Sequence, residues 1–251
     1  MKGVGEVIST IIIMSAILVS SILIFYTSLY IMSHSINAAE YGYMKSSLIN
    51  IAVNTPLIIE GNTFIITVPK GSVGVGYFVN DRIYEVDVLT DSGWERITVD
   101  DKPTSIQVTS YKIVVPSKIV YGSSNFTVND ISYLPIVAEY YDNGASIINY
   151  NLTRFFINSY LVQSENGTEV YIRAVYVQLR VSYISGPHKV VFMPASKVLE
   201  KEFRNVQNIV FKEIDSRSGT VLREYSPSEI FALGYKVNLL LIVERINVVM
   251  T

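Results

Sequence analysis

The chain has 251 residues, with 20 Lys and Arg against 22 Asp and Glu, a formal net charge of −2 and no cysteine. This balance offers no basic surface for nucleic acid, and the lack of cysteine excludes disulfide bonds and thiol chemistry. Charged residues make up only 17 % of the chain, below the roughly 25 % of ordinary soluble domains.

The first predicted element is an apolar helix over residues 7–32. No charged side chain occurs between Glu6 and Glu40. A helix of 26 residues is about 39 Å long, which exceeds the roughly 30 Å of hydrocarbon in a bilayer. A soluble protein would need an unusually large core to bury such a segment. The segment is therefore predicted to span a membrane.

The residues before this segment read MKGVGEVIST. A secretory signal peptide has an apolar region of only about 7–15 residues, so this pattern differs from one. The Lys2-Gly3 pair in front of an apolar helix resembles the amino terminus of archaeal type IV pilins and pilin-like proteins. The resemblance covers the first thirty or so residues.

The resemblance implies that a prepilin peptidase cuts between Gly3 and Val4 and that the apolar helix is retained as the core of a filament. Residues 1–3 would then be a leader peptide. Glu6 would be the acidic residue near the new amino terminus, able to meet the α-amino group of a neighbouring copy. It would be the third residue, whereas bacterial pilins have it fifth. Glu6 is alternatively an interfacial residue with no partner.

Orientation is predicted from the basic residues. Lys2 precedes the apolar segment and the next basic residue is Lys45, which favours a cytoplasmic amino terminus and an external bulk of the chain. The expected location is the cell surface or an extracellular filament, with the precursor inserted in the cytoplasmic membrane.

The helical pattern continues beyond the membrane segment, with apolar residues three and four apart up to Ile51. Pro56 disfavours helical geometry at the residue before it. One helix over residues 4–54 is predicted, followed by an external β-rich domain over residues 55–251. A simple anchor has no evident need of the second half of this helix, whereas a pilin packs its globular domain against it.

From residue 56 onward the pattern has a period of two, which predicts an α+β fold: the long helix followed by an antiparallel β-sandwich in one large or two small lobes. Predicted hairpins pair residues 57–60 with 63–68 and 77–79 with 83–89. Residues 170–184 are predicted to be a strand with one buried and one solvated face. Residues 237–249 are predicted to be a central strand, or one covered by a neighbouring copy.

Three further features complete the outline of the domain. One helix is predicted over residues 196–206, and a strand over residues 210–214 follows it. A second helix is predicted to begin at Ser226 and to end at Gly234. A seam between two lobes would lie near Asp142-Asn143-Gly144.

A search for chemistry leads to no predicted catalytic site, metal site or cofactor. The two histidines are His34 and His188, and no motif for zinc or for a serine nucleophile accompanies them. The Gly-rich residues 71–76 precede β-patterned sequence, not a helix, which argues against a phosphate loop. The acidic positions that lack the spacing of a calcium loop are interpreted as solvated turns: Asp87, Asp91, Asp100 and Asp101.

Glycans are candidate partners of the external domain. Sequons begin at Asn125, Asn151 and Asn166. Three sequons are no more than this composition provides by chance. Asn166 lies in a Ser-Glu-Asn-Gly sequence typical of an exposed turn, which makes it the favoured candidate.

Two functions are carried forward. The first is a structural subunit of a type IV pilus-like filament that assembles with copies of itself through its amino-terminal helix. Close approach of the helices would be permitted by small residues: Ser9, Ser15, Ser20, Ser21 and Ser28. The alternative is a single-pass surface protein, minor pilin or stator-like component that binds another envelope protein. A membrane-tethered enzyme is the least favoured interpretation.

Overall fold

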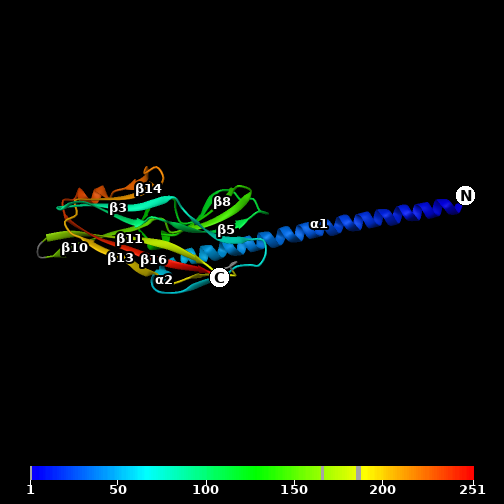
Figure 1. Ribbon diagram of the computed structural model, residues 1–251, viewed down its shortest axis with the longest axis horizontal. Helices are drawn as coiled ribbons and strands as arrows, with labels where there is room; N and C mark the ends of the chain where they lie inside the picture. The colour runs from blue at the N-terminus through cyan, green and yellow to red at the C-terminus, as the bar shows by residue number, and fades with distance from the viewer. Residues whose placement is uncertain (1, 165–166, 185–187) are drawn as a thin grey trace.

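A computed structural model describes residues 2–164, 167–184 and 188–251, with side chains from residue 8 onward except that of residue 164. Helix α1 (Lys2–Val53) is continuous over 52 residues, so it is about 78 Å long. In Figure 1 it runs out of the β domain as a single rod toward the N-terminus. The predicted helix over residues 4–54 is therefore confirmed.

The second half of α1 is built into the domain core. Tyr41, Met44, Leu48, Ile51 and Ala52 are all buried. They recur at intervals of three or four residues, so they form one stripe along the helix. This stripe faces the sheets, and it fixes the helix axis along the length of the domain.

The turn after α1 differs from the sequence prediction. Residues 57–59 belong to a short helix, α2 (Thr55–Ile59), and Glu60 is its C-cap. Pro56 lies in the first turn of α2, where the missing N–H of a proline costs nothing. Asn62 N–H then donates to Leu57 O at 2.9 Å. The hairpin predicted around Gly61-Asn62 is wrong because its first half is helical.

A seven-stranded sheet forms the middle of the domain, with β13 paired only with β16. Its strands are β1 (Phe64–Thr67), β12 (Lys189–Phe192), β16 (Lys236–Met250), β11 (Gly167–Tyr183), β10 (Phe155–Ser164), β7 (Thr127–Val128) and β13 (Ser196–Phe203). β16 pairs in parallel with β11 along its whole length and antiparallel with β12 and β13. The prediction of a central strand at 237–249 is confirmed.

Two smaller antiparallel sheets cover the seven-stranded one. The four-stranded sheet contains β15 (Val221–Tyr225), β14 (Asn208–Asp215), β3 (Arg82–Thr90) and β4 (Gly93–Asp100). The five-stranded sheet contains β2 (Gly74–Val79), β5 (Thr104–Ser110), β9 (Ala145–Asn151), β8 (Ile136–Asp142) and β6 (Lys118–Tyr121). A 3-10 turn, η1 (Ile131–Tyr133), and a short helix, α3 (Ser228–Phe231), complete the described elements.

Strand β11 lies between two hydrophobic cores, and this corrects the predicted solvated face. Val175, Val177 and Leu179 belong to the core shared with α1 and the five-stranded sheet. Ala174 and Tyr176, on the opposite face, belong to the core under the four-stranded sheet. The middle of β11 is buried on both sides because a sheet packs on each face of it.

Other expectations are corrected by pairings distant in sequence. Residues 77–79 and 83–89 are strands, but β2 pairs with β5 and β3 with β4 and β14, so they form no hairpin. Residues 196–203 are strand β13, not helix, because β16 provides a partner.

Residues 142–144 are the tight turn of the β8–β9 hairpin, with Asn143 and Gly144 at positive φ, so no seam lies there. The α+β class, with mostly antiparallel sheets, and the strand at 210–214 are confirmed.

Candidate functional site

The exposed half of α1 is the main candidate site. The large apolar side chains from Ile8 to Met32 are 41–73 % exposed. α1 is also the one helix of the described residues that is long and apolar enough to cross a membrane. Its most apolar stretch of 18 residues has a mean hydropathy of 2.5, and none of that stretch is buried. Soluble monomers rarely expose so large an apolar surface, so this half of the helix is suited to lipid or to other chains.

The five predicted serines are all exposed along this rod, but they do not share one face. At about 100° per residue, Ser9 and Ser20 lie about 20° apart around the axis, as do Ser21 and Ser28. Ser15 lies on a third side. A helix inside a bundle has neighbours in several directions, so small residues on separate faces suit packing on more than one side.

The hydroxyl groups of Ser21 and Thr27 on the rod are satisfied by its own backbone. Ser21 Oγ donates to Ile17 O at 2.8 Å, and Thr27 Oγ1 donates to Leu23 O at 2.7 Å. Such bonds to the residue four positions earlier leave the hydroxyl without need of water. The apolar character of the surface is therefore preserved at these positions.

The residues of the predicted processing site lie at the start of the rod. The backbone of Lys2, Gly3, Val4 and Glu6 is helical in α1. Their side chains lie outside the described part of the chain. Cleavage after Gly3 and a pairing role for Glu6 stay predictions.

Polar contacts hold the other half of α1 to the domain. Lys45 Nζ lies 2.8 Å from Glu139 Oε2 on β8. Thr55, at the start of α2, donates its hydroxyl to Ile51 O of α1 at 2.9 Å and lies 3.0 Å from the Tyr150 hydroxyl in the core. Burial raises the pKa of the Tyr150 hydroxyl. Burial and the Glu139 carboxylate likewise raise the pKa of Tyr41. These polar contacts, together with the hydrophobic stripe, fix the position of α1 relative to the β domain.

The Gly-rich residues 71–76 also bind α1. Ser72 donates its backbone N–H and its hydroxyl to Glu40 Oε2, at 2.7 and 2.9 Å. The Gly71 position is so close that a Cβ atom there would overlap the Glu40 carboxylate. The segment therefore binds the Glu40 carboxylate of the chain's own helix.

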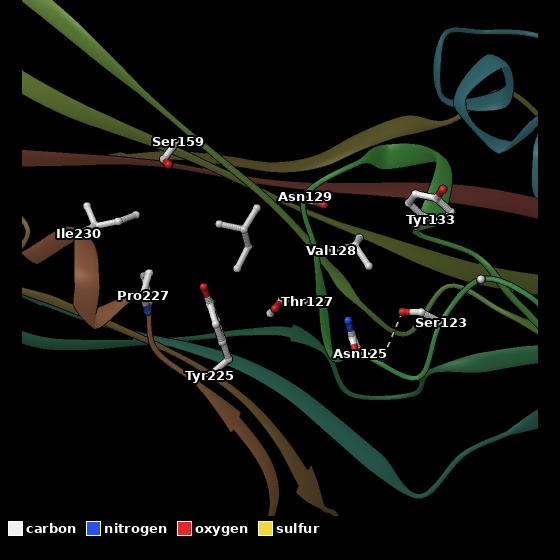
Figure 2. Close-up of a pocket in the computed structure, with 12 residues that line it drawn as sticks. Ser123, Asn125, Thr127, Val128, Asn129, Tyr133, Ser159, Tyr225, Pro227 and Ile230 are labelled. Carbon is white, nitrogen blue, oxygen red and sulfur yellow. Dashed lines mark hydrogen bonds between the residues drawn. The ribbon is translucent and has the colours of Figure 1, made fainter.

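A surface pocket lies beside β10 and α3, and in Figure 1 β10 is at the end of the molecule opposite the N-terminus. Its volume is about 580 Å³. Figure 2 shows Tyr225, Thr127, Asn129 and Ser159 around it. None of its twelve lining residues is charged. Amides, hydroxyls and tyrosine rings of this kind suit a neutral, hydroxyl-rich ligand. This pocket was not predictable from the sequence because its residues come from three separate stretches, 122–133, 157–159 and 225–230.

The sequons have different surroundings. Asn125 is exposed at the rim of this pocket, and its backbone N–H donates to Ser123 Oγ at 3.2 Å. Asn151 is partly buried at the end of β9, and its side-chain oxygen accepts a bond from Thr153, the hydroxyl residue of the same sequon. Asn166 lies outside the described residues. Asn125 is thus the more accessible of the two described candidates.

No group of three or more His, Cys, Asp or Glu able to hold a metal occurs in the described residues. The His34 ring stacks on Tyr30, with ring centres 6.3 Å apart. His188 pairs through its backbone with Thr251 and Val68.

Two predicted solvated acids are buried instead. Asp87 bonds Arg96 and Lys212, each at 2.8 Å. Asp100 is 2 % exposed and lies 2.7 Å from Arg180 Nη2. Both stand on strands of the four-stranded sheet, so the interpretation as turns is wrong for them, whereas Asp101 is exposed as expected. Their charges are used within the fold.

Comparison with known proteins adds no relative. No protein-family model matches the chain, and neither a curated protein nor a solved structure matches it. The residues and the geometry described above therefore carry the functional argument. They support membrane anchoring or pilin-like assembly through the apolar half of α1.

Proposed function

We propose that this protein is a structural subunit of a type IV pilus-like filament at the cell surface and that it has no catalytic role. The observation that carries this proposal is the single unbroken helix α1, one half exposed and apolar, the other docked in the β domain. A plain anchor requires the first half alone. A filament subunit uses both halves, because the rigid helix sets the β domain at a fixed position outside the bundle.

The proposed assembly exchanges one apolar environment for another. As a precursor, the subunit keeps residues 8–32 in the bilayer. After a prepilin peptidase removes residues 1–3, the rods of many copies pack together and helix–helix contacts replace lipid. Association in such surroundings depends on close packing at small residues, which the serines provide on several sides. Glu6 then has the free amino terminus of a neighbour as its proposed partner.

The decisive test is the mass of the mature protein together with the composition of surface fibres. The proposal expects a mature chain beginning at Val4 and sheared filaments in which this chain is the main component. A Gly3→Leu variant is expected to stay unprocessed and to give no filaments. An intact Lys2-Gly3 in the mature protein would instead support the single-pass surface protein, and a trimmed chain found at low abundance in fibres would support a minor subunit.

We further propose that the β domain has an adhesive role, with glycans as the class of ligand. The pocket beside β10 supports this, because it is polar, uncharged and lined by Tyr133 and Tyr225. Binding of the full chain to a panel of immobilised neutral oligosaccharides tests it. A Tyr225→Ala variant is expected to bind at least about tenfold more weakly, and Tyr77→Ala on β2 is the control. Equal binding by both variants would refute the role of the pocket.

A further inference from the structure

A second site lies where α1 leaves the β domain. A groove of about 540 Å³ runs along the helix beneath the segment between β5 and β6. Its wall nearer the N-terminus is formed by Tyr26, Leu29 and Tyr30. Its other wall is polar and includes Ser33, His34, Asn37 and Lys112. The groove is therefore apolar at one end and rich in hydrogen-bond donors at the other.

One buried polar group in this groove lacks a partner, and one exposed group in it carries a positive charge that no carboxylate meets in the described part of the chain. Asn37 is 2 % exposed, and its Nδ2 donates to no described protein group, although buried donors are normally paired. Lys112 Nζ lies 3.3 Å from Ser33 Oγ and forms no ion pair with a carboxylate in the described part of the chain. The nearby Glu40 carboxylate is already bound by Ser72. Both groups are hydrogen-bond donors, so a bound acceptor would satisfy them, and an anion would in addition meet the positive charge of Lys112.

The position of the groove identifies the source of that anion. From Ile8 to Tyr30 the helix advances about 33 Å, slightly more than the roughly 30 Å of bilayer hydrocarbon. Tyr26 and Tyr30 then lie at the outer interface, where tyrosine is enriched. Ser33 and Lys112, whose Nζ lies 3.3 Å from Ser33 Oγ, are then at the depth of the lipid headgroups, and Asn37 is one helical turn further out. The neighbouring Tyr111 and Val114 in the β5–β6 segment are 75 and 76 % exposed.

We propose that this groove binds the headgroup phosphate of an anionic phospholipid while the subunit is in the membrane. Lys112, Ser33 and the Asn37 amide hold the phosphate, and the start of the acyl chains lies against Tyr26, Leu29 and Tyr30. The inference rests on the proposed function only in that α1 spans a bilayer before assembly. Bound lipid sets the depth of the domain above the membrane.

The test uses the full chain in vesicles of equimolar phosphatidylglycerol and phosphatidylcholine. After mild detergent extraction, native mass spectrometry counts the lipid retained by each single chain. About one phosphatidylglycerol per chain is expected. Lys112→Gln should lower its retention about fivefold, the factor that corresponds to about 1 kcal/mol for a basic residue at an anionic surface, and Asn37→Leu should also lower it. Lys236→Gln, which removes an exposed charge at the start of β16, is the matched control and should retain lipid normally.

Three outcomes would overturn the proposal. Equal retention by Lys112→Gln and the control would show that the groove holds no headgroup. Complete displacement of the lipid by millimolar inorganic phosphate would show a site for the free anion. A photoreactive residue in place of Tyr30 tests what occupies the groove. Cross-links to phosphatidylglycerol support the proposal, whereas cross-links only to a second copy would show that a neighbouring helix occupies the groove.

These outcomes are separate from those of the filament test. The lipid count is made on dispersed single chains, and co-flotation with vesicles first confirms insertion. A chain that retains lipid but forms no filament refutes the pilus alone. A chain that forms filaments but retains no lipid refutes the headgroup site alone.

Discussion

Lys45 Nζ on α1 lies 2.8 Å from Oε2 of Glu139 on β8, and the Glu139 side chain is only 3 % exposed. This contact joins the long helix to the five-stranded sheet. A second cation, Lys118 Nζ, lies 3.8 Å from the same oxygen. The helix is therefore fixed to the domain by a buried charge as well as by its hydrophobic stripe.

Lys45→Gln is expected to lower the free energy of unfolding by about 3 kcal/mol, because it leaves the buried Glu139 carboxylate without its nearer cation. Urea unfolding of the detergent-solubilised chain, followed by near-ultraviolet circular dichroism, measures this change. The double variant Lys45→Met with Glu139→Leu is expected to regain most of the loss, since two apolar groups can replace such a pair. A double variant no more stable than Lys45→Gln would refute the account.

Asp100 gives a prediction for pH. Burial raises the pKa of its carboxyl, although Arg180 partly opposes this. A carboxyl with a raised pKa in the folded state contributes stability below its unfolded value of about 3.8 and loses it as the pH rises through the folded value. Asp100→Asn should remove this decline of unfolding free energy above pH 3.8.

Asp87 is the internal contrast for that experiment. Burial tends to raise the pKa of its carboxyl, but hydrogen bonds from Arg96 and Lys212 prevail and lower it. Its stabilisation is present above the unfolded value and is lost as the pH falls through the folded one. Asp87→Asn should therefore reduce the loss of stability in acid, a change opposite in sign to that of Asp100→Asn. Two pH profiles altered in the same direction would contradict both assignments.

Arg154 is a guanidinium buried without a full set of partners. Its side chain is 1 % exposed, and only Nη1 donates to a described group, the Tyr133 carbonyl at 2.9 Å. Burial and the nearby Arg223 lower the pKa of Arg154 to about 10. Arg154→Met is expected to raise the free energy of unfolding by about 1–3 kcal/mol, because an apolar group of similar length needs no partner. Arg154→Lys keeps the charge and should bring no gain; a destabilised methionine variant would show that the charge has a bound partner.

The contact between Glu40 and Ser72 predicts local protection. Glu40→Ala removes the acceptor of two hydrogen bonds. Each hydrogen bond to a charged group contributes about 1.5–3 kcal/mol to the stability of the fold. Exchange of the Ser72 amide hydrogen is expected to become at least about tenfold faster. Gly71→Ala should have a similar effect, because its Cβ displaces the carboxylate. Gly76→Ala, where a Cβ meets nothing within 4 Å, is the control.

The exposed rod predicts a dependence on side-chain size. Ser20→Leu is expected to lower the filament yield at least about tenfold, since a larger side chain keeps neighbouring helices apart. Ser20→Ala keeps a small residue and should assemble normally. Insertion of both variants into membranes should be unchanged, as measured by co-flotation with vesicles. Equal yields of the two variants would place Ser20 away from any helix contact.

The sequence predicted what depends on local pattern and long apolar runs. Residues 7–32 and Pro56 indicated the long helix, and the apolar run at 237–249 indicated the central strand. It did not predict which strands meet. Residues 196–203 have a helix-favouring, charged composition, yet they pair with β16, and the energy of that pairing comes from residues some forty positions away.

The candidate sites show the same limit. The exposed rod was evident from composition, because no charge interrupts it. The headgroup groove was not, since Lys112 and Asn37 are distant in sequence and meet only when β5 packs beside α1. Likewise Tyr176 and Gln178 looked like a solvated face of β11. Their polar atoms are satisfied under the four-stranded sheet by Asp100 and by the Val99 carbonyl.

The lengthwise docking of α1 has a mechanical consequence. A pull on the rod acts parallel to the helix axis, so it loads the contacts of Tyr41, Met44, Leu48 and Ile51 in shear. Contacts loaded in this way must break together, whereas strands peeled apart from one end break in succession. The joint between the rod and its β domain is thus arranged to resist tension along the rod, the direction in which a tethered surface protein is strained by flow.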